Sequence, residues 1–400
     1  MPKLVWSVLQ QENNITQPLL DMFKKVFPQA QVEVANIPWD TYKQEFTSMA
    51  IHGHGIDVSQ TGAPVANDLI AMNALRPFTA REMALLGGEN AFIEVARKSS
   101  LCFTENKVWS VPLFSDPYVI TYWSDMLEQA GIDEKQAFTL EHIEETFQRL
   151  QASGIEYPWL INFHYDKFIP IHSVASWVWA QNTDFISEDG RKALFIGSAA
   201  LTGLKAYFRL AKFVSPACLH LDDQQYNRLF LERRAAATIC NMGYSYNWYR
   251  SLQPELRSRL KVALPPGPPL VGGSSLVIWN TTRVEELAFE LVKFLVSPEI
   301  QSVYSLQMGQ MPVRQEALNQ PPFSTDPFLQ SYANILTQGR VFPLAKFSGL
   351  LEDQLTQALQ CVWHTVLSEP EADLEKIILS NLSPLARRYE NMTNSLPRKP

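Results

Sequence analysis

The sequence lacks several features that would point to a membrane, a nucleic acid or a disulfide framework. No stretch approaches the roughly 18 consecutive apolar residues of a membrane-spanning helix. Acidic residues outnumber basic ones by 41 to 34, and no run of Lys and Arg is longer than a pair such as Lys24-Lys25. The chain therefore offers no basic field for a phosphate backbone, and we do not expect a nucleic acid as its partner.

Cysteine is scarce, with four residues widely spaced at Cys102, Cys218, Cys240 and Cys361. There is no CxxC pair, and the cysteines and histidines form no zinc-site motif. The apolar neighbours of Cys240 in AAATIC favour buried free thiols. A disulfide stays open as an alternative, and the spacing does not say which cysteines it would join.

Short catalytic motifs are also missing: the sequence contains no GxSxG, HExxH or GxxxxGK[ST], and no GxGxxG follows a strand. His52 and His54 in IHGHG are interpreted as part of a solvated turn, and His164 and His172 as ordinary histidines. We therefore predict no catalytic residue, no metal and no cofactor.

The chain has 400 residues, 46% of them hydrophobic, which is too long for one ordinary core and favours two lobes. It runs directly into a strand-like segment without a charged-then-apolar leader. We expect a periplasmic or cell-surface location if a leader has been removed. A cytoplasmic location and a fragment of a longer protein remain open.

Alternating and helical patterns follow one another at the start of the chain. Residues 3–9, 31–37 and 56–62 read as strands, and residues 18–26 and 38–50 between them read as helices. This βαβαβ order predicts a parallel sheet with helices packed on its faces. Further on, Pro112 and Pro117 break a β-rich segment and indicate a crossing between lobes.

A long ordered pattern lies between residues 272 and 317. It begins with GGSSLVIW, continues into a helix ending in KFLVSPEIQ, and closes with Gly309 and the PVR of residues 312–314. This pattern resembles the extracellular solute-binding proteins of carbohydrate ABC importers, the family of the maltodextrin-binding protein. Supporting segments occur in family order at residues 19–34, 38–46, 56–62, 111–133 and 229–246, although Arg233-Arg234 stand where the family usually carries Gly-Lys.

The resemblance implies an α/β, two-lobed fold like that of the periplasmic binding proteins, each lobe a mostly parallel sheet flanked by helices, joined by a hinge. The N-terminal lobe is expected to contain residues 1–112 plus 267–313, and the C-terminal lobe residues 113–266 plus 314–400. The hinge crossings are expected near residues 111–116 and 265–273.

A site that discriminates sugars needs paired donors and acceptors for the hydroxyls and flat aromatic rings for the ring faces. The chain has ten Trp and thirteen Tyr to draw on. In open parallel sheets ligands bind beyond the carboxyl ends of the strands. Loops at those ends, together with the resemblance, give these candidate ligand-binding residues: Gln11, Glu12, Trp39, Gln60, Thr61, Gly62, Asp116, Tyr118, Trp177, Asn241, Met242, Gly243, Tyr244, Tyr246, Gly273, Ser274 and Arg314.

We therefore expect a monomer that binds a small polar solute, a sugar or oligosaccharide, in a cleft between the lobes and delivers it to ABC permease subunits without chemical change. A polyol or a glycerol phosphodiester stays open as the ligand. A ligand-sensing domain of a signalling protein is one alternative function. A glycoside hydrolase is another, because Asp57, Asp116 and Asp184 offer the carboxylates that such an enzyme needs.

Overall fold

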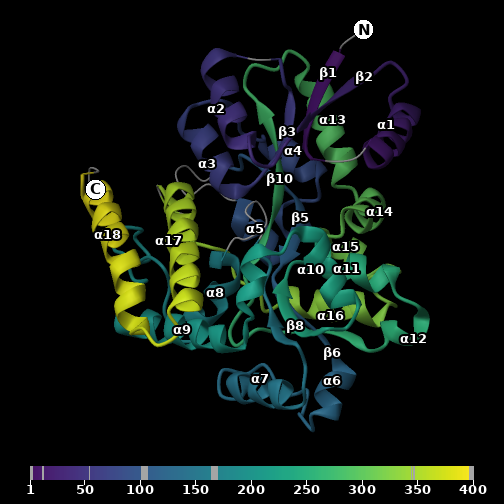
Figure 1. Ribbon diagram of the computed structural model, residues 1–400. Helices are drawn as coiled ribbons and strands as arrows, with labels where there is room; N and C mark the ends of the chain where they lie inside the picture. Colours follow the sequence, from purple (N-terminus) through teal and green to yellow (C-terminus); the bar gives the residue numbers. More distant parts are fainter. Residues whose placement is uncertain are drawn as a thin grey trace. The chain divides into compact units, whose positions relative to one another are not determined.

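The computed structural model describes residues 3–10, 13–53, 55–100, 107–163, 170–343, 345 and 347–395 (Figure 1). The chain divides into two compact units. Unit 1 comprises residues 1–116 and 272–333, and unit 2 comprises residues 117–271 and 334–400.

The division differs from the predicted lobes by a few residues at 113–116 and 267–271, and most at residues 314–333, which belong to unit 1 and not to the second lobe. Two bonds hold the start of this segment within unit 1. The Arg314 guanidinium donates to the Leu86 carbonyl at 2.5 Å, and the Ile93 amide donates to the Val313 carbonyl at 2.9 Å. The chain passes between the units three times, as the predicted lobe boundaries also require, and the third passage lies after residue 333 instead of after residue 313.

The sheet of unit 1 has the strand order β11-β5-β10-β3-β1-β2. β1 (Lys3–Leu9) pairs in parallel with β2 (Gln31–Ile37) and with β3 (Val58–Thr61), as the βαβαβ pattern predicted. The remaining pairings that involve later strands are antiparallel: β10 (Val271–Trp279) with β3 and with β4 (Leu75–Arg76), and β11 (Met311–Pro312) with β5 (Val111–Pro117).

Helices flank this sheet, with α2 packed on α3 and α14 packed on α1 and α13. The helix that the pattern of residues 272–317 predicted is α13, with the bounds Glu285–Leu295. The helices of this part of the chain are α1 (Asn13–Val26), α2 (Tyr42–His52), α3 (Ala63–Ala71), α4 (Ala80–Leu85), η1 (Glu89–Ala91), α5 (Glu94–Ser100), α13 (Glu285–Leu295), α14 (Pro298–Met308), α15 (Gln315–Leu318) and α16 (Pro327–Leu336).

The sheet of unit 2 has the order β7-β8-β6-β9. β7 (Tyr157–Leu160) and β8 (Ala235–Cys240) are parallel, but β6 (Val119–Trp123) runs antiparallel to both β8 and β9 (Leu260–Ala263). The expectation of a mostly parallel sheet therefore does not hold for this unit.

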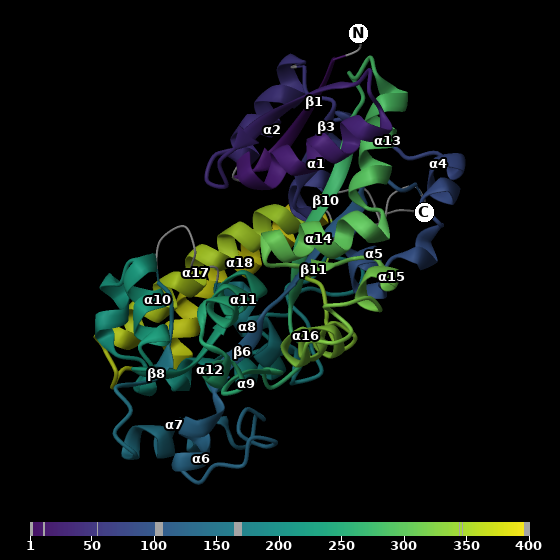
Figure 2. The ribbon, with the colours of Figure 1, turned by 90° about the vertical axis from the view of Figure 1, so that its right-hand side faces the viewer.

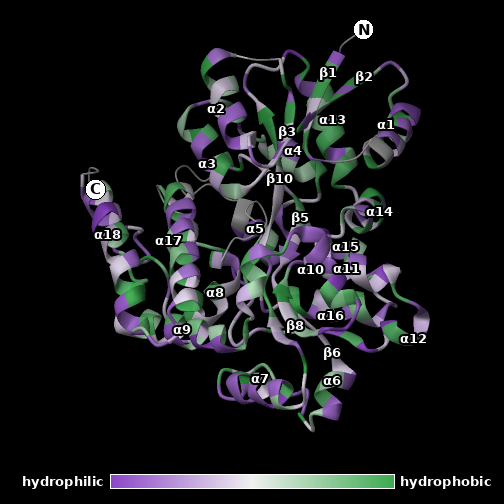
Figure 3. Cartoon of the chain, viewed as in Figure 1, coloured by the Kyte–Doolittle hydropathy of each residue, from purple (hydrophilic) through white to green (hydrophobic). Residues whose placement is uncertain are grey.

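Two long helices at the end of the chain, α17 and α18, lie side by side (Figures 1 and 2). Hydrophobic and hydrophilic residues follow one another along both helices (Figure 3), as in amphipathic helices, which have one apolar and one polar face. The helices of unit 2 are α6 (Ser124–Gln129), α7 (Ile143–Ala152), α8 (Pro170–Trp179), α9 (Ser198–Phe208), η2 (Arg209–Phe213), η3 (Pro216–His220), α10 (Asp223–Leu231), α11 (Met242–Ser251), α12 (Pro254–Arg257), α17 (Ser348–Ser368) and α18 (Leu374–Asn394).

Within the described ranges, no helix combines the length and the apolar character needed to cross a bilayer. Cys218 and Cys240 are buried free thiols, as predicted. Cys361 is also free, but it is exposed, because it lies on the outer face of α17. Cys102 and His54 lie outside the described residues.

Unit 2 depends on a close approach of α8 and α9. A Cβ atom at Gly203 of α9 would lie 2.3 Å from the Trp177 carbonyl oxygen of α8. Only glycine leaves room for the backbone of α8 at this point. The contact holds the helix that carries Trp177 against the helix that carries Tyr207.

We predict that Gly203→Ala destabilises the protein by about 1–3 kcal/mol, because the added methyl group forces the two backbones apart. The strain therefore outweighs the roughly 1 kcal/mol by which alanine favours a helix over glycine. Urea unfolding followed by circular dichroism measures the change in the free energy of unfolding. The matched control is Gly55→Ala, where a methyl group meets nothing within 4 Å. Equal stability of Gly203→Ala and the wild type would contradict the proposed packing.

Candidate functional site

In unit 1, the three parallel strands β1, β2 and β3 end at one edge of the sheet, where ligands bind in open α/β sheets. Trp39 follows β2 at this edge and is 44% exposed. Its ring packs against the edge of Tyr42, with centroids 5.5 Å apart. A Cβ atom at Gly62, which follows β3, would lie 3.5 Å from the Tyr42 hydroxyl. The accessible Trp39 indole therefore lies near the loop after β3, with Tyr42 in contact with the indole and next to Gly62 of the loop.

Gln60 and Ser274 support this edge from within. The Gln60 side-chain amide donates to the Ser274 hydroxyl at 3.0 Å, and its carbonyl accepts from the Leu9 amide at 3.4 Å. The neighbouring Gly273 has φ +139°, and a Cβ atom there would lie 2.1 Å from the Phe114 carbonyl oxygen. Because Gln60 and Ser274 are buried and bonded to each other, they hold the ends of β1, β3 and β10 together.

The other candidates of unit 1 differ in accessibility. Thr61 is buried, with its hydroxyl donating to the Gly62 carbonyl at 3.3 Å. Asp116 ends the unit on β5 and is 9% exposed. Gln11 and Glu12, predicted after β1, lie outside the described residues.

Arg314 was predicted to bind ligand, but the structure gives it a supporting role within unit 1. The side chain is 7% exposed, and its guanidinium donates to the Leu86 carbonyl. The guanidinium carbon also lies 5.1 Å from the centre of the Phe92 ring, and Glu316 pairs with it at 3.4 Å. These partners occupy the polar groups that would otherwise meet a ligand.

In unit 2, a polar cluster lies beyond the carboxyl ends of the parallel strands β7 and β8. The Tyr244 hydroxyl donates to Asp223 Oδ1 at 2.5 Å. The Asn162 amide donates to the same oxygen at 3.0 Å and to the Tyr244 hydroxyl at 3.1 Å. All three side chains are half-buried, so the cluster combines fixed geometry with access to solvent. We refer to Asn162, Asp223 and Tyr244 as the unit 2 cluster.

The sequence predicted Tyr244 but missed Asn162 and Asp223. Asn162 lies two residues after β7, and its position beyond a buried YPWL strand is a signal that could have found it. Asp223 gave no such signal, because it begins a helix, where an acidic residue is common.

Residues 241–246 otherwise build the helix that carries Tyr244. Asn241 caps α11, its side-chain oxygen accepting from the Tyr244 amide at 3.3 Å. Met242 and Tyr246 are buried, and Gly243 stands in the first turn of the helix. Of this predicted group, Tyr244 is the residue whose polar end joins the unit 2 cluster.

Tyr118 contacts a second polar pair, which consists of His172 and Glu352. The Tyr118 ring meets the ring of His172 in an edge-on contact, with centroids 4.8 Å apart. The His172 ring nitrogen Nε2 lies 3.2 Å from Glu352 Oε1 on α17. The raised pKa of Tyr244 comes first from burial and then from Asp223, with Tyr118 as the smallest contribution. His172, predicted as ordinary, thus lies among the candidate residues.

Trp177 was predicted to stack on a ligand, and its placement corrects that prediction. The side chain has 0% exposure, and its ring packs on Tyr207 with centroids 4.9 Å apart. It belongs to the core of unit 2 because residues 170–179 form a helix whose residues are nearly all buried.

Two carboxylates considered for hydrolysis have structural partners. Asp57 accepts from the Val5 amide at 2.8 Å and from the Thr282 hydroxyl at 2.6 Å. Asp184 pairs with Arg340 and accepts from the Trp179 indole nitrogen at 2.9 Å. No group of three or more His, Cys, Asp or Glu side chains in the part of the chain described here is arranged to hold a metal ion.

Two α/β units whose sheets carry aromatic and polar side chains beyond their strand ends define a solute-binding class of protein. The family comparison agrees with this class. Residues 19–331 match the bacterial extracellular solute-binding proteins, and the chain belongs to this family. No curated protein matches the sequence closely enough to count as a relative.

Solved structures share the fold over nearly the whole chain. The sugar-binding protein MalE from Xanthomonas citri has a TM-score of 0.83 at 17% identity, covering 98% of both chains. Maltose-bound MalE3 of T. maritima has a TM-score of 0.79 at 20% identity, covering 98% of this chain and 99% of that one. UgpB from Mycobacterium tuberculosis, in complex with glycerophosphocholine, has a TM-score of 0.78 at 15% identity, covering 98% and 100%. The predicted two-lobed α/β fold class is confirmed.

The tyrosines of unit 2 generate a prediction on alkaline pH. Burial raises the pKa of Tyr389 to about 12. Burial also raises the pKa of Tyr226 well above its usual value, and it does the same for Tyr244, helped by Asp223. These side chains stay protonated in the folded protein at pH values where an unfolded tyrosine, with a pKa of about 10, ionises.

We therefore predict that the free energy of unfolding falls as the pH rises above about 10, by up to ~1.4 kcal/mol per pH unit for each such tyrosine. Urea unfolding between pH 8 and pH 11 measures the slope. Tyr226→Phe should make the slope shallower, because phenylalanine has no proton to lose. A stability that stays constant up to pH 11 would contradict this account.

Proposed function

We propose that this protein binds a sugar or oligosaccharide and delivers it, unchanged, to the permease of an ABC transporter. The unit 2 cluster carries the proposal. Its amide, phenol and carboxylate present both donors and acceptors at fixed distances, which is what the hydroxyls around a sugar ring require.

Trp39 supplies the second requirement of a sugar site, a flat accessible ring. Sugar rings present C–H groups on their faces, and indole rings bury such surfaces while keeping a polar end in water. Trp39 is the one tryptophan among the exposed large apolar side chains found in the described residues. Its ring is held by the contact with Tyr42, so it can receive a ligand without first being ordered.

Sugar complexes among the similar structures support a sugar as the ligand. One of these structures is a sugar-binding protein and another holds maltose, whereas a third holds the polyol D-mannitol. A location outside the cytoplasm fits a family of extracellular proteins. We further propose that the protein acts as a monomer, that ligand closes the two lobes about a hinge at the predicted crossings, and that it performs no catalysis.

Thermal melting against mono-, di- and oligosaccharides, polyols and amino acids tests the proposal. A ligand at about one hundred times its dissociation constant should add roughly 2.7 kcal/mol of stability. We expect a saturable shift with one class of sugar and recovery of that sugar intact by chromatography. No shift with any sugar would refute the assignment, and cleaved sugar would point to a hydrolase.

Trp39→Ala should weaken binding of the sugar found in that panel by about 1–3 kcal/mol, because the variant loses the stacking surface. Isothermal titration calorimetry measures the change. Ile51→Ala is the matched control, since Ile51 is also an exposed apolar residue of the same region, 64% exposed at the other end of α2. If both variants bind as the wild type does, the ligand does not stack on Trp39.

A further inference from the structure

Asp223 and Asn227 lie one turn apart on α10, so their side chains share one face of that helix. The Asn227 side-chain nitrogen donates to Asp223 Oδ2 at 3.4 Å and to the Asp223 backbone carbonyl at 2.6 Å. The Asn227 side-chain oxygen accepts from the Trp248 indole nitrogen of α11 at 2.6 Å. Resting on the sugar-binding function proposed above, we infer that Asn227 is a positioning residue, which holds the Asp223 carboxylate where a sugar hydroxyl donates to it.

The Trp248 indole decides which way round the Asn227 amide lies. An indole nitrogen can only donate a hydrogen bond, so the atom that faces it must be the Asn227 oxygen. The amide nitrogen then faces Asp223, whose ionised carboxylate can only accept. Trp248 is itself 2% exposed, and its ring stacks on Phe230 with centroids 4.2 Å apart. The orientation of Asn227 therefore follows from a donor that the core of unit 2 holds in place.

The Asp223 carboxylate keeps the capacity to accept a bond from a ligand. Among the residues that the structure describes, the side chains of Tyr244 and Asn162 donate to Oδ1, and that of Asn227 donates to Oδ2. A carboxylate has about four acceptor positions, so Oδ2 can accept a further bond. Asp223 is half-buried. A ligand hydroxyl that donates to Oδ2 therefore meets an acceptor whose direction Asn227 has fixed.

Fixing the carboxylate before the ligand arrives lowers the free-energy cost of binding. The last torsion of an aspartate side chain has broad energy minima, so an unsupported carboxylate turns readily. Binding must then offset the loss of that freedom. Without Asn227, the side-chain donors described above all bind Oδ1, and Oδ2 is no longer held. Removing the Asn227 amide should therefore weaken sugar binding even though Asn227 itself need not touch the sugar.

An aspartate in place of Asn227 gives the sharpest test, because it replaces the donor by a second carboxylate. The new carboxylate would lie next to Asp223 Oδ2, and two carboxylates this close do not both ionise readily. At acidic pH the pair shares a proton, and the protonated new side chain donates to Asp223 as the amide does. At pH 8 both groups are charged, and their repulsion turns Asp223 away from the ligand.

Calorimetry with Asn227→Asp at pH 5 and pH 8 tests the inference. The probes are glucose, galactose, maltose, lactose and maltotriose, and the comparison uses the one that the wild type binds most tightly. Relative to the wild type at the same pH, we expect the affinity to stay within about threefold at pH 5 and to fall about tenfold at pH 8. Comparison at the same pH removes the effect of any group common to both proteins, such as His172. Tyr226 and Tyr244 also face Asp223, but burial raises the pKa of both far above this range.

Two further variants separate the hydrogen bond from packing. Asn227→Leu removes the donor at every pH, so it should weaken binding by about tenfold at both pH 5 and pH 8. Trp248→Phe keeps an aromatic ring beside Phe230 but removes the donor that orients Asn227. It should weaken binding by about threefold at both pH values. Melting without ligand confirms that each variant folds, and Trp248→Phe tests the inference even if a variant of Asn227 does not fold.

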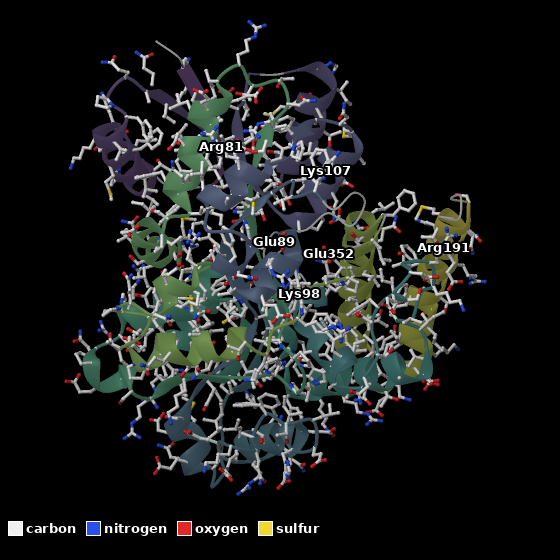
Figure 4. The ribbon with its side chains drawn as sticks, turned by 180° about the vertical axis from the view of Figure 1, so that it is seen from behind. Arg81, Glu89, Lys98, Lys107, Arg191 and Glu352 are labelled. Atoms are coloured by element: carbon white, nitrogen blue, oxygen red, sulfur yellow. The ribbon has the colours of Figure 1, made fainter. Side chains whose placement is uncertain are left out.

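Asn391→Asp is the matched control, because it adds the same charge to an exposed residue of unit 2. Asn391 belongs to α18, which packs on α9 and α17. The Thr393 hydroxyl of the same helix donates to the Arg191 carbonyl at 2.9 Å, and Figure 4 shows Arg191 beside this helix. The control should bind the probe as the wild type does at both pH values.

The outcomes distinguish the inference from the proposed function. If Asn227→Asp binds as the wild type does at both pH values, or loses the same affinity at both, Asn227 does not position the carboxylate, and sugar binding stands. A loss at pH 8 that Asn391→Asp shares would assign the effect to net charge, which also overturns the inference. Unchanged binding by Trp248→Phe would show that the indole does not orient the amide. If no sugar binds the wild type, the proposed function fails and the inference fails with it.

Discussion

Unit 1 depends on a small set of buried hydrogen bonds that join strands distant in sequence. The Ser59 hydroxyl accepts from the Trp279 indole at 2.7 Å and from the Ser7 hydroxyl at 2.6 Å, which ties β3 to β10 and to β1. Two residues earlier, Asp57 accepts from the Val5 amide and from the Thr282 hydroxyl. Unpaired polar groups at this depth cost free energy, so the bonds allow β10 one register only. The Gln60–Ser274 contact, and the edge that presents Trp39, follow from that register.

Unit 2 also places polar side chains at the ends of its parallel strands, but different hydrogen bonds hold them there. Its sheet contains a single parallel pair, β7 and β8, but the ends of that pair are where Asn162 and Asn241 emerge. The Tyr226 hydroxyl bonds with Thr238 of β8 at 2.8 Å, which fixes α10 and therefore Asp223 against the strand. In both units, buried polar contacts between strands and neighbouring elements position the side chains at the carboxyl ends of the strands.

Local patterns were sufficient to predict much of the fold from the sequence. Alternation marked β1 and β2, a short buried segment ending at a glycine marked β3, and helical spacing marked α13, because each lies in one continuous stretch of the chain. α18 was missed because Pro384 lies within it, and a proline normally ends a helix.

Fewer residues of the candidate site than elements of the fold could be predicted from local sequence patterns. Loops after strands gave Trp39 and Tyr244, since position along the chain predicts those ends. Trp177 was placed wrongly because residue type cannot distinguish a stacking ring from a core ring. Asp223 and Glu352 were missed because only contacts across 21 and 180 residues join them to Tyr244 and His172. Such contacts leave no trace in local spacing.

The position of β10 has a consequence for how the protein is made. β10 begins at Val271 and lies between β5 and β3, although β3 ends at Thr61 and β5 at Pro117, far earlier in the chain. Until residues 271–279 leave the ribosome, the first 116 residues form a sheet with its central strand absent and two open edges. Nascent chains of this protein must therefore keep those edges from pairing with each other or with neighbouring chains while most of unit 2 is synthesised.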